Sequence, residues 1–383
     1  MSALLYLLTL GIPLAGTMLF LPWIVRWSHA EGLLDEPGGR KQHAAPIPRL
    51  GGIAFFLSFT LTVALGFLLA PHVATLPEIR AVFPSIAAAL VEAHRVQTQL
   101  FGLLAGALII FVVGLMDDLA GERLPVGFKF AGQCLAAAIA VGCGIQVEFT
   151  GVSSFNAVIS FLWIVGISNA FNLLDNMDGL SAGVAVSSAF IFFLNALALG
   201  EIFLCLILAA FIGALVGFLR FNLHPAKVFM GDCGALFIGF TLSSLTILEG
   251  YVSPASSTLF PILMPVLVLA VPLIDTLSVI VIRLREGRPI YRGDRCHLSH
   301  RIVASGLSEP QAVKFLFLMT LALGMGALNL AHASVVRSLW TAAYSTIAAV
   351  LVLSGMRVGN SWNGGRAGSD APARRSTTTA EGL

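Results

Sequence analysis

Long apolar runs alternate with short polar stretches along most of the chain, and the length of the runs indicates the architecture. A helix needs about 20 consecutive apolar residues to cross a bilayer. We count eleven runs near that length, which predicts an all-α polytopic integral membrane protein with about 11 transmembrane helices. The predicted spans cover 3–25, 50–70, 99–116, 128–147, 155–174, 180–199, 202–220, 233–251, 258–282, 311–331 and 337–356.

Composition agrees with this pattern, and the placement of basic residues gives an orientation. Hydrophobic residues make up 57% of the 383 and charged residues 11%, with a mean hydropathy of +0.91, which excludes a soluble globular chain. Nearly all Lys and Arg fall in alternate polar stretches, so the positive-inside rule predicts the N-terminus outside and the C-terminus in the cytoplasm. The net charge of +2 gives no indication of nucleic-acid binding.

The domain organisation is simple. The first run lacks a basic start and is too long for a cleaved signal peptide. We therefore expect one membrane domain over 1–356, followed by a disordered cytoplasmic tail over 357–383 that is rich in Gly, Ser, Thr and Arg. The five cysteines form no CxxC pair and no metal-binding spacing.

Four polar side chains recur at every third position where two predicted spans meet. Residues three apart share a helix face. Poor helix formers at the end of the series favour a helix that stops there, with its last carboxylates facing an aqueous loop. An ordinary polar turn is the alternative, but it needs no Asn or Asp at each third position. The four residues are Asn169, Asn172, Asp175 and Asp178.

Further carboxylates occur at the ends of other spans on the same predicted face. Asp117 and Asp118 end an apolar run, where adjacent carboxylates repel each other unless a cation or a shared proton intervenes. Asp232 lies between two glycines just before a span, and a helix N-cap is the alternative role there. Ligand sets of oxygen alone favour Mg²⁺ or Mn²⁺ over zinc.

Basic groups accompany these carboxylates. Lys41, His43 and Arg49 lie in a loop stiffened by prolines and are suited to phosphate, although ordinary positive-inside residues would explain the charges alone. Lys129 begins a span on the same face, and Lys227 lies in the loop before Asp232.

A second basic loop carries two histidines. His297 and His300 are three residues apart and are flanked by Arg295 and Arg301. The flanking cations favour an anion such as a diphosphate over a metal, and an incidental basic loop is the alternative. Asp275 lies inside a predicted span, where an ionisable residue either caps a broken helix or supports the site.

Carboxylates, a divalent cation and basic groups on one membrane face are the components of phosphoryl transfer. The membrane setting suggests a lipid phosphate as one substrate. A transporter or flippase would instead place charges mid-span or in paired broken helices, and only Asp275 and Glu201 hint at this. The intact carboxylate set argues against a catalytically inactive scaffold.

Taken together, these motifs resemble the polyprenyl-phosphate N-acetylhexosamine-1-phosphate transferases of glycosyltransferase family 4, relatives of the phospho-N-acetylmuramoyl-pentapeptide translocase. The resemblance runs in order from about 31 to 310. It rests on Pro46-x-Pro48-Arg49-x-Gly51-Gly52, Asp117-Asp118, Asn169-x-x-Asn172-x-x-Asp175-x-x-Asp178-Gly179-Leu180, Phe229-Met230-Gly231-Asp232 and His297-x-x-His300-Arg301.

The resemblance implies transfer of a sugar 1-phosphate from a UDP-sugar to undecaprenyl phosphate. UMP would be released and a lipid-linked glycan of the cell envelope begun, with Mg²⁺ at the cytoplasmic face of a bacterial inner membrane. The implied metal ligands are Asp118 and Asp232, and Asp117 is the implied base or nucleophile. The resemblance also implies that Asn172, Asp175 and Asp178 face the nucleotide and that Lys41 and the loop of His297, His300 and Arg301 contact the diphosphate. We expect the catalytic residues to include Asp118, Asp175, Asp178, His297 and His300 besides Asp117. The expected substrate-binding residues are Lys41, His43, Arg49, Lys129, Asn169, Asn172, Lys227, Arg295 and Arg301.

Three positions depart from the family pattern. Asn176 stands where Gly is usual, Ala235 where Ser is common, and Ser299 where a histidine is usual. The run of three histidines of the muramoyl-pentapeptide branch is also absent, so UDP-GlcNAc is the favoured donor. Another UDP-N-acetylhexosamine and UDP-MurNAc-pentapeptide are the alternatives, and the sequence leaves a homodimer open.

Overall fold

The computed structural model describes residues 2–36, 45–77, 81, 96–121, 123–148, 151–249, 263–289 and 296–328. These ranges are helical apart from turns and one short ladder, in which β1 (Leu34–Asp35) pairs antiparallel with β2 (Ile47–Pro48). The helices are α1 (Ser2–Ala30), α2 (Gly52–Thr75), α5 (Gln97–Leu119), α6 (Val126–Gly142), α7 (Ser153–Leu174), α8 (Leu180–Leu199), α9 (Ile202–Asn222), α10 (Gly231–Leu248), α11 (Met264–Val268), α12 (Ala270–Arg285), α13 (Leu298–Ala304) and α14 (Glu309–Leu328).

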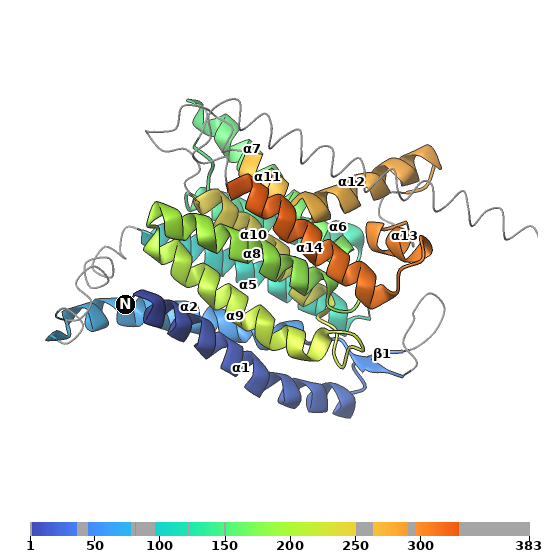
Figure 1. The fold of residues 1–383 in the computed structure, drawn as a ribbon, viewed down its shortest axis with the longest axis horizontal. Helices are drawn as coiled ribbons and strands as arrows, with labels where there is room; N and C mark the ends of the chain where they lie inside the picture. The colour runs from blue at the N-terminus through green and yellow to red at the C-terminus, as the bar shows by residue number, and fades with distance from the viewer. Residues whose placement is uncertain are drawn as a thin grey trace, which may run out of the picture.

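The helices form a bundle (Figure 1), and many large apolar side chains are exposed on its outer surface. Eight of the described helices are long and apolar enough to cross a membrane, and α6 is apolar but shorter. Large aliphatic side chains point outward on several of them: Leu19 is 74% exposed, Leu162 62% and Leu318 66%. Such a surface suits lipid rather than water, so the predicted all-α, multi-span class is confirmed.

Most predicted spans correspond to single helices, but one does not. The part of 258–282 that the structure describes is divided at Leu269 into α11 and α12, so the prediction of one continuous span is wrong there. Pro272 has no N–H to donate to the carbonyl of Val268; Ser188 Oγ on α8 donates to that carbonyl instead, at 3.3 Å. The predicted span 337–356 and the tail 357–383 lie outside the described residues.

Helix α10 forms the centre of the bundle. Every residue from Cys233 to Ile247 is buried, and α10 packs against α2, α5 and α7. Small residues allow backbones to approach closely, as is common between membrane helices. A Cβ at Gly114 of α5 would lie 2.5 Å from the Cα of Cys233, and a Cβ at Gly239 of α10 would lie 2.6 Å from the Cα of Ser168.

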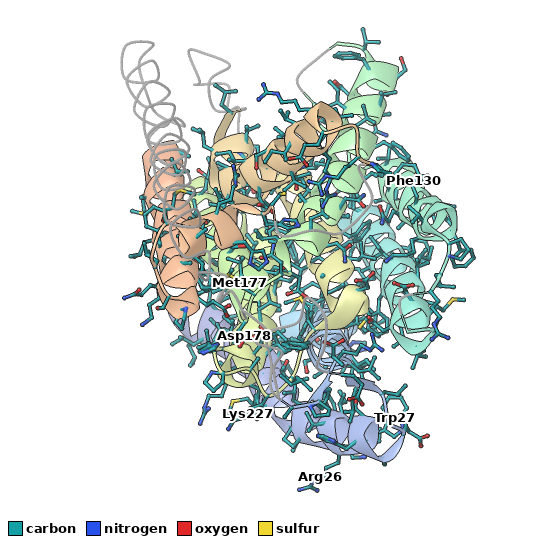
Figure 2. The ribbon with its side chains drawn as sticks, turned by 90° about the vertical axis from the view of Figure 1, so that its right-hand side faces the viewer. Arg26, Trp27, Phe130, Met177, Asp178 and Lys227 are labelled. Carbon is teal, nitrogen blue, oxygen red and sulfur yellow. The ribbon has the colours of Figure 1, made fainter. Side chains whose placement is uncertain are left out.

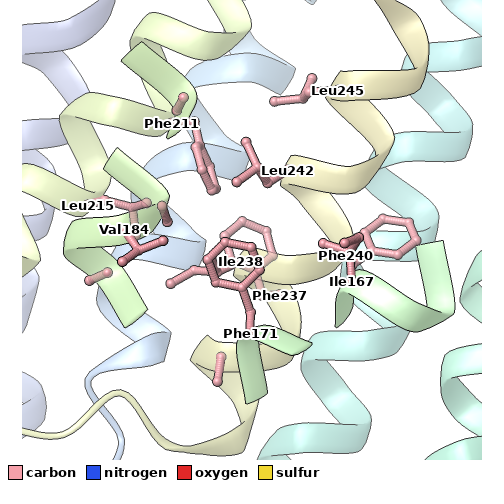
Figure 3. Close-up of a cluster of buried hydrophobic side chains, with 14 of the residues drawn as sticks. Ile167, Phe171, Val184, Phe211, Leu215, Phe237, Ile238, Phe240, Leu242 and Leu245 are labelled. Carbon is pink, nitrogen blue, oxygen red and sulfur yellow. The ribbon is translucent and has the colours of Figure 1, made fainter. Parts of the chain in front are cut away.

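Apolar side chains from four helices fill the space around α10. Phe237 and Phe211 have ring centroids 6.3 Å apart, and Phe59 lies 5.6 Å from Phe237 in an edge-on arrangement. Figure 3 shows this cluster, to which α7 contributes Phe171 and α8 contributes Val184. The packed centre fixes the relative positions of the helix ends, where the polar residues lie.

Several chain reversals meet at one end of the bundle. The ends of α5, α7 and α9 lie there together with the starts of α6, α8 and α10, and α13 and the β1–β2 ladder lie at the same end (Figure 1). Backbone hydrogen bonds join this end: the N–H of Phe229 donates to the carbonyl of Pro48 at 2.8 Å, and that of Gly51 to the carbonyl of Phe229 at 2.9 Å.

Candidate active site

An ammonium group bridges two carboxylates at this end of the bundle. Lys129, in the first turn of α6, places Nζ 2.8 Å from Oδ2 of Asp117 and also contacts Oδ2 of Asp232. The second oxygen of each carboxylate accepts a further hydrogen bond, from the N–H of Leu124 to Asp117 and from Nδ2 of Asn172 to Asp232, both at 3.0 Å. Four helices, α5, α6, α7 and α10, therefore contribute to one polar cluster.

Asp118 makes a different set of contacts from its neighbour. Its Oδ1 accepts the N–H of Asp232 at 2.9 Å and its Oδ2 that of Cys233 at 3.0 Å, so a carboxylate on α5 caps the N-terminus of α10. Gly231 makes this possible with a φ of +71°. A Cβ there would lie 2.5 Å from Oδ2 of Asp118 and 2.4 Å from the carbonyl oxygen of Arg49.

The turn between α7 and α8 presents two carboxylates. Helix α7 ends at Leu174. Gly179, the residue just before α8, has a φ of +75°, and its N–H donates to Oδ1 of Asn222 at 3.1 Å. Asp178 Oδ2 accepts the N–H of Ala226 at 3.0 Å and lies 3.0 Å from Nδ1 of His224. The prediction that the helix stops within this series is confirmed.

Asp175 differs from the other carboxylates of the site. Within the ranges that the structure describes, no donor forms a hydrogen bond to its side chain. Burial, and then the negative charges of Asp232, Asp118 and Asp178, raise the pKa of Asp175 to about 8. The cluster thus carries more carboxylates than Lys129 neutralises, which favours a bound cation.

The histidine segment folds back onto two other parts of the chain. His297 Nδ1 lies 2.8 Å from Oδ2 of Asp275 on α12, and Ser299 Oγ donates to Oδ1 of Asn176 in the α7–α8 turn at 2.5 Å. Arg301 also donates to Oγ of Ser278 on α12, at 2.7 Å. Helix α13 therefore joins α12 to the carboxylate turn.

The remaining predicted site residues take varied positions. Asn169 Nδ2 donates to Oε1 of Gln133, one turn of α7 before the carboxylate cluster. His300 has its ring centroid 6.4 Å from that of His297.

Seen from the site end, Asp178 lies nearer the middle of the molecule than Lys227, which is exposed (Figure 2). Lys41, His43 and Arg295 lie outside the described residues.

Sequence reasoning left the role of Asp275 undecided, and the structure gives it two contacts with the histidine segment. It also shows that Asn222 orients the α7–α8 turn, donating through Nδ2 to the carbonyl of Val228 at 2.8 Å. No spacing in the sequence links these positions, so only their polar character in apolar surroundings could have singled them out.

The donor chemistry of the cluster fits Mg²⁺, since carboxylates supply only hard oxygens. The two predicted ligands are nevertheless engaged by protein donors: Asp118 by backbone amides, Asp232 by Lys129 and Asn172. Among the residues that the structure describes, no three His, Cys, Asp or Glu side chains converge closely enough to hold a metal. Metal binding at Asp118 and Asp232 therefore stays a prediction.

The fold and the site define a multi-pass membrane protein with a carboxylate cluster at its helix ends, and comparison with known proteins identifies its family. The model of glycosyl transferase family 4 matches residues 100–250. A probable undecaprenyl-phosphate N-acetylglucosaminyl 1-phosphate transferase of Bacillus subtilis (strain 168) is 31% identical over 338 residues, which are 86% of each chain.

Two further relatives carry related names. A decaprenyl-phosphate N-acetylglucosaminephosphotransferase of Mycobacterium tuberculosis is 31% identical over 77% of this chain and 75% of its own length. A phospho-N-acetylmuramoyl-pentapeptide-transferase of Carboxydothermus hydrogenoformans is 29% identical over 82% of this chain and 94% of its own. The chain belongs to glycosyl transferase family 4, among the polyprenyl-phosphate sugar-1-phosphate transferases.

Proposed function

We propose that the protein transfers GlcNAc-1-phosphate from UDP-GlcNAc to undecaprenyl phosphate, releases UMP and begins a lipid-linked glycan of the cell envelope. The names of the two relatives with 31% identity support this donor. Nearly all Lys and Arg lie on one predicted face of the membrane, which supports a site that faces the cytoplasm. The bacterial relatives support a bacterial inner membrane.

The observation that carries the chemistry is the cluster of Asp117, Lys129 and Asp232 at the ends of three helices. In the proposed reaction, an oxygen of the lipid phosphate attacks the sugar-bearing phosphorus of the UDP-sugar. The bond from this phosphorus to the bridging oxygen breaks, and UMP leaves with that oxygen. Asp117 takes the proton of the lipid phosphate where one is present, and Lys129 offers positive charge to the anionic substrates.

The other residues bind and orient. We assign the uridine and ribose to the face formed by Asn172, Asp175 and Asp178, and the diphosphate to the basic groups of α13. Mg²⁺, held by Asp118 and Asp232, would neutralise diphosphate charge. His297 and Arg301 reach the site region because Ser299 bonds to Asn176 beside Asp175.

The test is UMP release by the purified full-length protein in detergent, with undecaprenyl phosphate and Mg²⁺. UDP-GlcNAc, UDP-GalNAc and UDP-MurNAc-pentapeptide are supplied in parallel, the last because of the muramoyl-pentapeptide relative. We expect UMP with UDP-GlcNAc, its loss on adding EDTA, and a loss of at least about a hundredfold in Asp117→Asn, since that variant removes the proton acceptor. UMP from another donor would overturn the sugar assignment, and none from any donor would overturn the activity.

A further inference from the structure

Among the residues that the structure describes, Asp275 is the most deeply buried carboxylate that the proposed chemistry does not use. It lies on α12, is 0% exposed, and faces the first residues of α13. Its Oδ1 accepts the N–H of Leu298 at 2.5 Å, and its Oδ2 lies 2.8 Å from Nδ1 of His297, which is itself only 4% exposed. A carboxylate in such a place needs partners for both oxygens, and α13 supplies both.

These contacts determine which ring nitrogen of His297 carries a proton. An ionised carboxylate only accepts hydrogen bonds, so the Nδ1 atom facing Asp275 must be the donor. In the neutral ring the Nε2 atom then has the free lone pair and acts as the acceptor. Nε2 is therefore the nitrogen left for a substrate.

The start of α13 also lies next to the carboxylate turn. Ser299 follows His297 by two residues, and its hydroxyl donates to Asn176, the residue after Asp175. Ser278, three residues after Asp275 on the same face of α12, accepts from Arg301. The segment that carries His297 is thus held from two sides, by α12 and by the α7–α8 turn.

We propose that Asp275 is a positioning residue for the transfer reaction: it fixes the Nδ1–H tautomer of His297 and so leaves the lone pair of Nε2 free to accept a hydrogen bond or a proton from a hydroxyl group of the substrate. This inference rests on the proposed function. The competing explanation is a purely structural one, in which Asp275 only caps the start of α13 through Leu298.

Asp275→Asn separates the two explanations. The side-chain oxygen of Asn can still accept the N–H of Leu298, which keeps the cap and turns the amide NH₂ toward His297. That NH₂ is a donor, so Nδ1 must become the acceptor and the ring proton moves to Nε2. The variant therefore keeps the fold of α13 and reverses the tautomer.

The experiment measures UMP release and thermal unfolding for wild type, Asp275→Asn, His297→Ala and the double variant. We expect Asp275→Asn to unfold at the wild-type temperature, to keep its KM for the UDP-sugar within about twofold, and to lose at least about tenfold in kcat. In the His297→Ala background the same change should alter kcat by less than about twofold, because Asp275 acts through His297. Wild-type kcat in Asp275→Asn, or an equal loss in both backgrounds, would overturn the proposal.

Glu249→Gln is the matched control. Glu249 is also a buried carboxylate, it accepts a hydrogen bond from Asn195 at 2.9 Å, and it lies at the opposite end of α10 from Asp232. The same acid-to-amide change should leave kcat within about twofold of wild type.

A second measurement tests the pairing without relying on activity. ¹⁵N NMR of protein labelled at histidine, at a pH where the ring is neutral, should show Nδ1–H for His297 in wild type and Nε2–H in Asp275→Asn. The resonance is identified by its loss in His297→Ala. If wild type releases no UMP the proposed function fails, whereas the same tautomer in both proteins would refute the pairing itself.

Discussion

Ser299 Oγ donates a hydrogen bond to Oδ1 of Asn176 across 123 residues of sequence. These are two of the positions at which the sequence motifs led us to expect other residues, a glycine at 176 and a histidine at 299. A glycine at 176 would leave room for a larger residue at 299, and the shorter serine here reaches the longer asparagine. We therefore expect the two departures to compensate for each other across this contact.

Because of this contact, we expect the effect of a substitution at Ser299 on activity to depend on the residue at position 176. Ser299→His alone should lower UMP release by about tenfold, because the imidazole would have to displace Asn176 in a packed turn. Adding Asn176→Gly should restore activity to within about threefold of wild type by making space. Activities measured for both single variants and the double variant give the coupling, and simple multiplication of the two single effects would count against the compensation.

Lys129 is predicted to be needed for both stability and activity. Lys129→Ala leaves Asp117, which is 1% exposed, without its cation, and breaking a buried ion pair from one side costs on the order of 3 kcal/mol. We expect a lower unfolding temperature and a loss of at least about a hundredfold in UMP release. Lys314→Ala removes an exposed lysine on α14 and is the control. An active, stable Lys129→Ala protein would contradict the bridging role.

Gly231 is predicted to tolerate no side chain. Its φ of +71° disfavours other residues, and a Cβ would press on the Asp118 carboxylate and the Arg49 carbonyl, so Gly231→Ala should separate Asp118 from the amides of α10. We expect activity to fall at least about a hundredfold, as judged by UMP release. Gly66→Ala on α2, where a Cβ meets open space, should behave like wild type. Similar activity in the two variants would show that the cap is dispensable.

The raised pKa of Asp175 predicts a pH-dependent stability. In the folded protein Asp175 holds its proton up to about pH 8, whereas in the unfolded chain it releases it near its ordinary pKa of 3.8. Between these values the folded state binds more protons, so raising the pH destabilises it. Relative to Asp175→Asn, wild type without divalent cations should lose stability from about pH 4 to pH 8 and change little above that. Unfolding temperatures that run parallel across this range would exclude the shift.

The helices could be predicted from the sequence because the length of each apolar run can be compared directly with the length that a helix needs to cross a bilayer. It also placed Asn172, Asp175 and Asp178 at a helix end, since their spacing and the following glycine are local signals. Lys129 could not be assigned to its two partners in this way, because Asp232 lies 103 residues further along. Only the packing of α10 against α5 brings them together.

Two other features depended on tertiary contacts. The interruption at Leu269 follows from Pro272, but a proline inside a membrane helix also occurs without a break. Asp275 could not be assigned because its partners lie on a helix that folds back after residues outside the described ranges. Pro272 and Asp275 could both be singled out from the sequence by residue type, but their roles became clear only from the residues that surround them in the structure.

The contacts of Lys129 also determine the order in which the carboxylate cluster can assemble while the protein is being synthesised. Lys129 and Asp117 belong to successive helices and can meet soon after both have emerged from the ribosome. Asp232, and the amides that hold Asp118, arrive only with α10. The nascent chain therefore lacks the complete carboxylate cluster until its central helix has been inserted.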